Sequence, residues 1–159
     1  MAVSLNWCYK QKDGIRLVEP NDNLALSYLK MAENAIGTMN REKNYNLMFA
    51  ISACYYSMYY SLYAILRKIG VKCEIHSCTL EFMKVMLSKF YTIEDMKTIK
   101  IAFDSRNIAQ YYADKVVSKE DSDFIIARAP FFLSKSKEIL SKLNEKDAKE
   151  IREKVEQRL

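Results

Sequence analysis

The chain has 159 residues, a formal net charge of +5 at pH 7 and a hydrophobic content of 50%. One domain with a core of its own fits this length, and the apolar content excludes an intrinsically disordered protein. The three glycines and two prolines leave few breaks and favour long helices. The mild positive charge permits an acidic partner such as RNA but does not require one.

No stretch of the sequence approaches the roughly 18 apolar residues of a membrane span, and the first residues do not resemble a secretory signal. We therefore expect a cytoplasmic protein that has no membrane association and needs no cofactor. Thiols stay reduced in that compartment, so all four cysteines are predicted to be free: Cys8, Cys54, Cys73 and Cys78.

Residues 1–20 lack a helical period and are predicted to form an N-terminal arm. Asp13-Gly14 is typical of a hairpin turn, and the segments on either side of it alternate in part. The arm is therefore either a short hairpin or an extended segment that packs on the helices. Pro20 followed by Asn21-Asp22-Asn23 then indicates the start of a helix.

Apolar residues spaced by three and four predict a first long helix over about residues 22–41 and a second over about 44–69. The second helix is apolar or aromatic nearly all round, so it should be central or carry a second buried face at a subunit interface. Gly70 is well placed as its C-terminal cap. Five tyrosines on this helix belong to the core or a dimer interface, or else form a surface on which bases stack: Tyr55, Tyr56, Tyr59, Tyr60 and Tyr63.

A shorter apolar pattern predicts a helix over about residues 78–90. Thr92 has an acidic residue three positions later, Asp95, and this variant of the capping box predicts that a fourth helix starts there. That helix should run to about residue 112 or 114.

Ser118 marks the start of the last main helix, which Pro130 should kink or break into two. Residues 144–159 mix both charge signs closely and predict a solvated, frayed terminal helix. Together these elements predict an all-α protein. It should be an up-and-down bundle of four to five main helices over residues 21–143, preceded by the arm over residues 1–20.

Arg106 lies on the apolar side of the fourth helix, three residues after Phe103. Burying a guanidinium without a partner is costly, so this charge should point into the core, a groove or another subunit. Two interpretations stay open. Arg106 forms a polar patch with Asn107 and Gln110 that binds the phosphate of a nucleotide or RNA, or it pairs with a buried acid and locks the bundle.

His76 is the single histidine of the chain, and with Cys73 and Cys78 it gives the pattern Cys-x-x-His-x-Cys. Cys8 could supply a fourth ligand, and structural zinc sites usually have four. The three ligands are nevertheless crowded together, and a second spaced pair is missing. We therefore predict no metal site, and we expect His76 in a loop where it caps the helix that begins near Cys78.

Four segments, in their order and spacing, resemble those of the HEPN superfamily, particularly its small stand-alone prokaryotic proteins. They are the tyrosine-rich helix from Tyr55 to Gly70, the loop Ile75-His-Ser77, the stretch Arg106-Asn-Ile-Ala-Gln-Tyr111, and the helix from Ala127 to Leu140. The resemblance covers about residues 22–143. It implies a helical bundle that forms a homodimer and, in many members, pairs with a minimal nucleotidyltransferase in a toxin–antitoxin module.

Active members of the superfamily are metal-independent RNases whose motif is an arginine followed, after four to six residues, by a histidine. Arg106 matches the arginine and Asn107 the asparagine that often follows it, but Tyr111 and Tyr112 stand where the histidine is expected. Tyrosine titrates near pH 10, roughly, and is a poor proton shuttle at neutral pH. The resemblance also makes Tyr111 and Tyr112 candidates for modification by a nucleotidyltransferase partner.

These residues lead to two main hypotheses. The first is a dimeric module with a degenerate RNase motif that binds nucleotide, RNA or a nucleotidyltransferase partner. The alternative is a divergent metal-independent RNase that uses Arg106 with Tyr111, Tyr112 or His76. The second hypothesis needs His76 of the other subunit to come within reach of Arg106 across the dimer. A purely structural dimer without a ligand is a third interpretation, and a groove beside Arg106 and Gln110 would argue against it.

Overall fold

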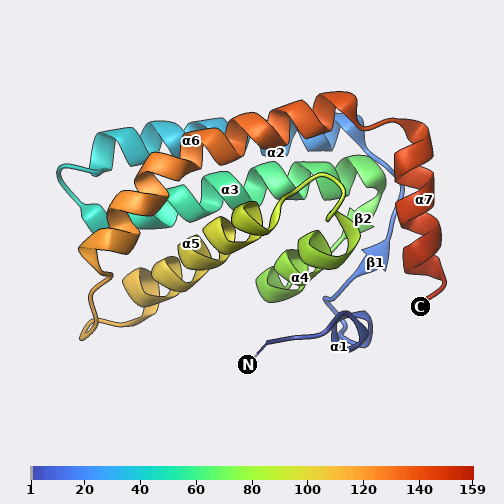
Figure 1. Cartoon of the computed structure of the whole chain (residues 1–159), viewed down its shortest axis with the longest axis horizontal. Helices are drawn as coiled ribbons and strands as arrows, with labels where there is room; N and C mark the ends of the chain where they lie inside the picture. Colours follow the sequence, from blue (N-terminus) through green and yellow to red (C-terminus); the bar gives the residue numbers. More distant parts are fainter. Residues whose placement is uncertain (1) are drawn as a thin grey trace.

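The computed structural model describes residues 2–159, which form seven helices and one two-stranded sheet (Figure 1). The four long helices are α2 (Asp22–Glu42), α3 (Leu47–Ile69), α5 (Ile93–Tyr111) and α6 (Lys119–Lys142). The short elements are α1 (Leu5–Tyr9), β1 (Arg16–Leu17), β2 (Val71–Lys72), α4 (His76–Met86) and α7 (Glu145–Glu156). The predicted all-α bundle is confirmed. No helix in the described part of the chain is both long enough and apolar enough to pass through a membrane.

Helix α3 is the central element, because it packs against α2, α5, α6 and α7 (Figure 1). Its side chains are buried nearly all round, as the sequence predicts for a central helix. Tyr55, Tyr59 and Tyr63 belong to the core, whereas Tyr56 and Tyr60 are half-buried. The tyrosine cluster is therefore mainly a packing feature, with two rings that reach toward the surface.

The ends of the long helices follow the signals in the sequence. The side chains of Asn21, Thr92 and Ser118 each accept a hydrogen bond from a backbone amide of the first turn that follows. Asp95 completes the capping box at the start of α5. Gly70 ends α3 with a φ of 91°, in the left-handed region where a side chain would be strained.

Two helix predictions need correction. Helix α4 runs from His76 to Met86, whereas the sequence predicted residues 78–90. Its N-cap is Ile75, whose side chain accepts no hydrogen bond, so the start carries no signal in the sequence. Helix α6 continues unbroken through Pro130, whose ring is exposed, so of the two predicted outcomes, a kink or a break into two helices, the break is excluded.

The N-terminal arm is not a hairpin. Its first segment is helix α1, capped by the hydroxyl of Ser4, and its second segment is β1. Strand β1 pairs antiparallel with β2, which follows α3, and places Arg16 opposite Lys72. Gly14 lies in the turn between α1 and β1, where a Cβ atom would stand 1.8 Å from the carbonyl oxygen of Cys8. The turn was therefore predicted in the right place. It joins helix α1 to strand β1, which pairs with β2 and not with the segment before the turn.

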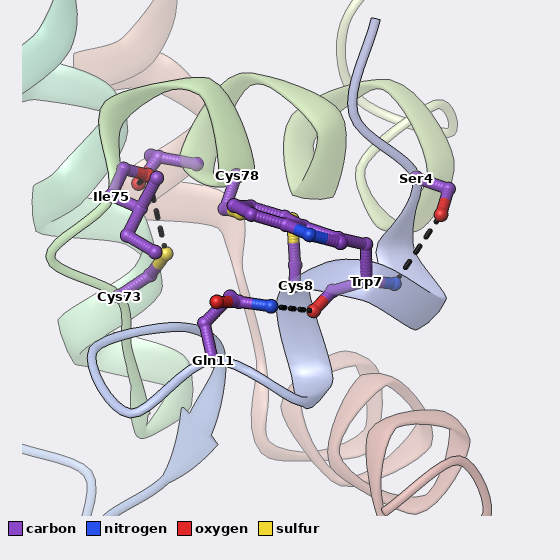
Figure 2. The surroundings of a disulfide bond; sticks show 8 residues. Ser4, Trp7, Cys8, Gln11, Cys73, Ile75 and Cys78 are labelled. Carbon is purple, nitrogen blue, oxygen red and sulfur yellow. Dashed lines mark hydrogen bonds between the residues drawn. A yellow bond between two sulfur atoms is a disulfide. The ribbon is translucent and has the colours of Figure 1, made fainter.

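A disulfide joins Cys8 of α1 to Cys78 of α4 (Figure 2). Their Cα atoms are 5.7 Å apart, although the two residues are separated by 70 positions in the sequence. The prediction of four reduced thiols is therefore wrong for this pair, because only the packing of α1 on α4 brings the two sulfurs together. Cys54 and Cys73 are free and buried.

The C-terminal segment is also more firmly packed than its charges predict. Ile151 and Val155, one turn apart on α7, are buried against the bundle. Arg152 lies between them, and its Nη1 donates to the carbonyl oxygens of Val18 and Gly70, each at 2.8 Å. The terminal helix lies where the sequence predicted it, but it is docked on the bundle and not frayed, since two apolar residues with helical spacing suffice to dock a highly charged helix.

Candidate functional site

Arg106 extends from α5 into a wall of aromatic rings, and only 5% of its surface is exposed. Its guanidinium carbon lies 4.8 Å from the centre of the Tyr55 ring, 5.7 Å from that of Tyr56 and 5.5 Å from that of Phe103. Such contacts stabilise a cation through the negative faces of the rings. They leave the charge itself uncompensated, because an aromatic ring carries no net charge.

No carboxylate among residues 2–159 forms an ion pair with Arg106. Its Nε atom is buried and lacks a hydrogen-bond partner. The interpretation in which Arg106 locks the bundle through a buried acid therefore has no support in the structure. A buried guanidinium without a counter-ion is the kind of group that an anionic ligand would satisfy.

The partners of Arg106 are all neutral. Nη1 donates to Oε1 of Gln110 at 3.2 Å and to the hydroxyl of Tyr111 at 3.3 Å. Both partners stand in the last turn of α5 and are exposed, Tyr111 to 69%. They form an outer layer between the guanidinium and solvent, which an incoming anion could displace.

His76 meets Arg106 from the other side, at the first residue of α4. Its Nδ1 lies 3.2 Å from Nη2 of Arg106 and 2.7 Å from the hydroxyl of Tyr55. Its ring stacks on Tyr59, with the two centres 4.1 Å apart and the planes inclined by 7°. A guanidinium can only donate, so Nδ1 accepts and the proton of the neutral ring is on Nε2.

The same surroundings set the protonation of these groups. Burial, followed by the positive charge of Arg106, lowers the pKa of His76 to about 4. Burial also raises the pKa of Tyr55 above its ordinary value, so that phenol stays protonated and can donate to Nδ1. At neutral pH the group therefore holds one full positive charge, on Arg106.

Asn107 and Tyr112, which the sequence placed in the same site, lie outside this hydrogen-bonded group. Asn107 is half-buried, one residue further along α5. Tyr112 caps α5, and its ring centre lies 4.1 Å from Nζ of Lys115. The structure thus brings together Arg106, Gln110, Tyr111 and His76 of the predicted residues. It adds Tyr55, which contacts His76. The spacing of four residues between Tyr55 and Tyr59 indicated that Tyr55 is buried, but it gave no indication of the contact with His76.

A shallow groove of about 370 Å³ opens beside the group, between α2, α3 and α5. Two of its residues also contact Arg106: Gln110 accepts its hydrogen bond, and the Tyr56 ring faces its guanidinium. Phe49, which is 55% exposed, adds a further aromatic ring. The groove is lined by Ala35, Thr38, Glu42, Phe49, Ser52, Ala53, Tyr56 and Gln110. It argues against a purely structural role.

Comparison with known proteins places this arrangement in a family, since the model of the HEPN domain matches residues 23–157. The chain belongs to the HEPN family. It is also 30% identical, over an alignment of 124 positions that covers 72% of this chain and 82% of the relative, to a protein of Methanocaldococcus jannaschii named "Putative toxin MJ0142". The HEPN match continues past residue 143, where the resemblance in the sequence stopped, and includes α7.

In this HEPN protein, the histidine expected after Arg106 in the motif is absent from α5. Tyr111 occupies a position of the missing histidine and places its hydroxyl on Arg106. The imidazole beside the arginine belongs instead to His76 of α4. Neutral His76 can donate through Nε2, or accept at Nδ1 once the guanidinium moves away, while Arg106 can bind two oxygens of a phosphate at once.

The cysteine–histidine pattern does not form a metal site in this HEPN fold. Within residues 2–159, no three His, Cys, Asp or Glu side chains are grouped closely enough to hold a metal ion. Cys8 and Cys78 are bonded to each other, and His76 turns toward Arg106 and Tyr55. The chemistry available at the site is therefore that of a guanidinium, an imidazole and phenols.

Proposed function

We propose that this HEPN protein binds the phosphate of RNA or of a nucleotide through Arg106 and acts in a module of the toxin–antitoxin type. The observation that carries the proposal is the burial of Arg106 without a carboxylate partner. Gln110 and Asn107, on the same part of α5, would add polar contacts around the phosphate. The name of the Methanocaldococcus jannaschii relative supports the toxin part of the proposal.

A homodimer is part of the same proposal. Seven large apolar side chains are exposed at the start of α3 and around the end of α5: Tyr45, Leu47, Met48, Phe49, Tyr111, Tyr112 and Val116. The loops after α2 and after α5 lie at the same end of the molecule, on the left in Figure 1. A second copy on this end would cover the apolar side chains and enclose the Arg106 groove.

A minimal nucleotidyltransferase is the partner that we propose from the family resemblance. Its target would be an exposed phenol near the motif. In the single chain, before a second copy covers this end, both Tyr111 and Tyr112 meet that requirement with exposed fractions of 69% and 47%. Tyr111 is the better candidate, because its hydroxyl contacts Arg106 directly. Co-expression with such an enzyme, followed by mass spectrometry, should locate added nucleotide on Tyr111. Modification at any other residue alone would contradict this assignment.

RNA cleavage is a second candidate function, and the proximity of His76 to Arg106 favours it. Cleavage through the 2′-hydroxyl needs a group that moves a proton beside the phosphate. The low pKa of His76 makes it a weak base at neutral pH, and its Nδ1 is already occupied by two donors. Binding is therefore the function that the geometry supports best.

The test is binding of a fluorescently labelled RNA oligonucleotide at fixed salt, followed by anisotropy. Arg106→Met should weaken binding at least about tenfold, because it removes the charge that pairs with phosphate. Arg128→Met removes an equal charge from an exposed position of α6 and should bind nearly as well as wild type. Absence of binding to RNA and to nucleotides by the wild-type protein would overturn the proposal.

The same samples decide the second candidate function when they are incubated with EDTA and separated on a gel. Cleavage by wild type that is lost in His76→Gln, while binding is kept, would establish a metal-independent RNase. Intact RNA in every lane would leave a binding role.

The dimer is tested by sedimentation: Phe49→Glu should give monomers, whereas Val85→Glu, at an exposed apolar position of α4, should not.

A further inference from the structure

We propose that Arg106 and His76 form a proton-linked anion site: a phosphodiester that pairs with the guanidinium brings a proton from solvent onto Nδ1 of His76. The site is the one proposed above to bind phosphate, so its proton linkage depends on that assignment. Proton linkage would make the affinity for RNA depend on pH, although phosphodiesters and guanidinium groups in general keep their charges near neutrality.

While no anion is bound, the contact between Arg106 and His76 excludes a second positive charge. Arg106 is always protonated, and its Nη2 donates to Nδ1 of His76 at 3.2 Å. A proton added to Nδ1 would place two positive charges in contact and leave both nitrogens as donors without an acceptor between them. Burial of the ring adds to this penalty, so His76 stays neutral while Arg106 lacks a counter-ion.

Within residues 2–159, Arg106 is the charged group that affects the pKa of His76, and the rings in contact with it are neutral. Helix α3 turns three phenols toward the ring, those of Tyr55, Tyr56 and Tyr59. Helix α5 contributes Arg106, the one charged group that shifts the pKa of His76. A bound anion would therefore introduce the first negative charge at this point of the fold.

Binding of an anion changes both the hydrogen bond that Nδ1 accepts from Arg106 and the net charge beside the imidazole. Two phosphodiester oxygens can take the place of Gln110 and Tyr111 at the guanidinium and can also satisfy the free Nε, which draws Arg106 away from His76. Nδ1 then loses the guanidinium as a donor, and the negative charge favours the imidazolium. The Tyr55 hydroxyl, 2.7 Å from Nδ1, can rotate its proton away and accept the new N–H.

The sign of the linkage follows from these pKa shifts. Binding raises the pKa of His76, so the bound state holds more protons than the free state between the two pKa values. The affinity for a phosphodiester should therefore rise as the pH falls through the bound-state pKa. It should level off below the free-state pKa of about 4. Above the bound-state pKa, His76 should not affect the affinity.

The single histidine makes this measurable, because its Cε1–H proton can be followed by NMR without ambiguity. The full chain is titrated with acid in sodium chloride, in sodium sulfate of equal ionic strength, and with a DNA dinucleotide. The dinucleotide offers a phosphodiester without a 2′-hydroxyl, so it cannot be cleaved. In wild type, sulfate and the dinucleotide should each raise the His76 midpoint by at least about one pH unit.

Arg106→Met is the decisive variant. Its His76 midpoint should be higher than that of wild type before any anion is added, since the neighbouring charge is gone, and neither sulfate nor the dinucleotide should move it further. Arg128→Met is the matched control and should behave as wild type. An equal response in Arg106→Met and wild type would place the anion elsewhere and overturn the inference.

The outcomes separate this inference from the proposed function. Binding that depends on Arg106 but leaves the His76 midpoint unchanged would overturn the proton linkage alone. No Arg106-dependent binding of the dinucleotide, of RNA or of sulfate would overturn both. A response to sulfate without a response to the dinucleotide would show a small-anion site and overturn the phosphodiester as the ligand.

Discussion

Arg106 of α5 and His76 of α4 meet at 3.2 Å within one chain, although 30 residues separate them in the sequence. The helix that carries Arg106 presents a tyrosine, Tyr111, at the position of the expected histidine. The imidazole therefore reaches the guanidinium from a separate helix, held by Tyr55 and by stacking on Tyr59. This pairing determines how the site should respond to substitution and to pH.

Arg106→Met should make the folded protein more stable, by about 1–2 kcal/mol. The side chains are of similar length, and the substitution removes a buried charge that no carboxylate compensates. Urea unfolding at neutral pH measures the change. Arg128→Met, at an exposed position, should stay within about 0.5 kcal/mol of wild type. Destabilisation of Arg106→Met alone would show that the charge is compensated inside the fold.

His76 should make stability depend on pH. The pKa of its ring is about 4 in the folded chain against an ordinary value of 6.5. The unfolded chain therefore binds the proton first as the pH falls, and stability is lost between about pH 6.5 and 4. Allowing for partial solvent access to the ring, we expect a loss of about 2 kcal/mol over this range.

His76→Gln isolates this contribution, because it keeps a polar side chain that does not titrate. Urea unfolding of both proteins at several pH values gives the difference between them, in which the shared carboxylates cancel. The wild type should lose more stability than the variant as the pH falls toward 4. Parallel curves for the two proteins would mean that His76 titrates near its ordinary value.

Tyr111→Phe should strengthen the binding of sulfate or of a phosphodiester by roughly two- to fivefold. The substitution removes the hydroxyl that competes for Nη1 of Arg106 but keeps the ring. Tyr112→Phe removes a hydroxyl that lies outside the group and should leave the affinity unchanged. Weaker binding by Tyr111→Phe would show that the phenol holds the anion rather than competing with it.

Reduction of the disulfide should destabilise the protein by about 4 kcal/mol, because the Cys8–Cys78 bond closes a loop of 70 positions in the unfolded chain. Thermal melts with and without reductant measure the loss. Cys8→Ser should melt at the same temperature in both conditions. Thiol counting after denaturation provides a direct check, since unreduced protein should react at Cys54 and Cys73 only.

The parts of the fold that could be predicted from the sequence are those set by local chemistry. Asn21, Thr92 and Ser118 cap helices because their side chains reach the backbone amides of the next turn. Gly70 ends α3 because a left-handed φ favours glycine. Helix α4 was misplaced because Ile75 provides no capping side chain.

Contacts between distant residues could not be predicted in this way. Arg106 was identified as a residue in need of a partner, but the nature of that partner depends on how α4 packs beside α5. The Cys8–Cys78 bond depends in the same way on the packing of a five-residue helix, α1, too short to show a period. Helix α7 was misjudged because two buried residues, Ile151 and Val155, are outnumbered by its charges.

Arg152 adds a consequence for the order in which this protein can be completed during synthesis. Its guanidinium donates to the carbonyl of Val18, 134 residues earlier, and to that of Gly70. Neither carbonyl can gain this donor until α7 has left the ribosome. The region around β1 thus gains this contact from a helix that is made 134 residues after Val18, and until then it should be open to proteases and chaperones.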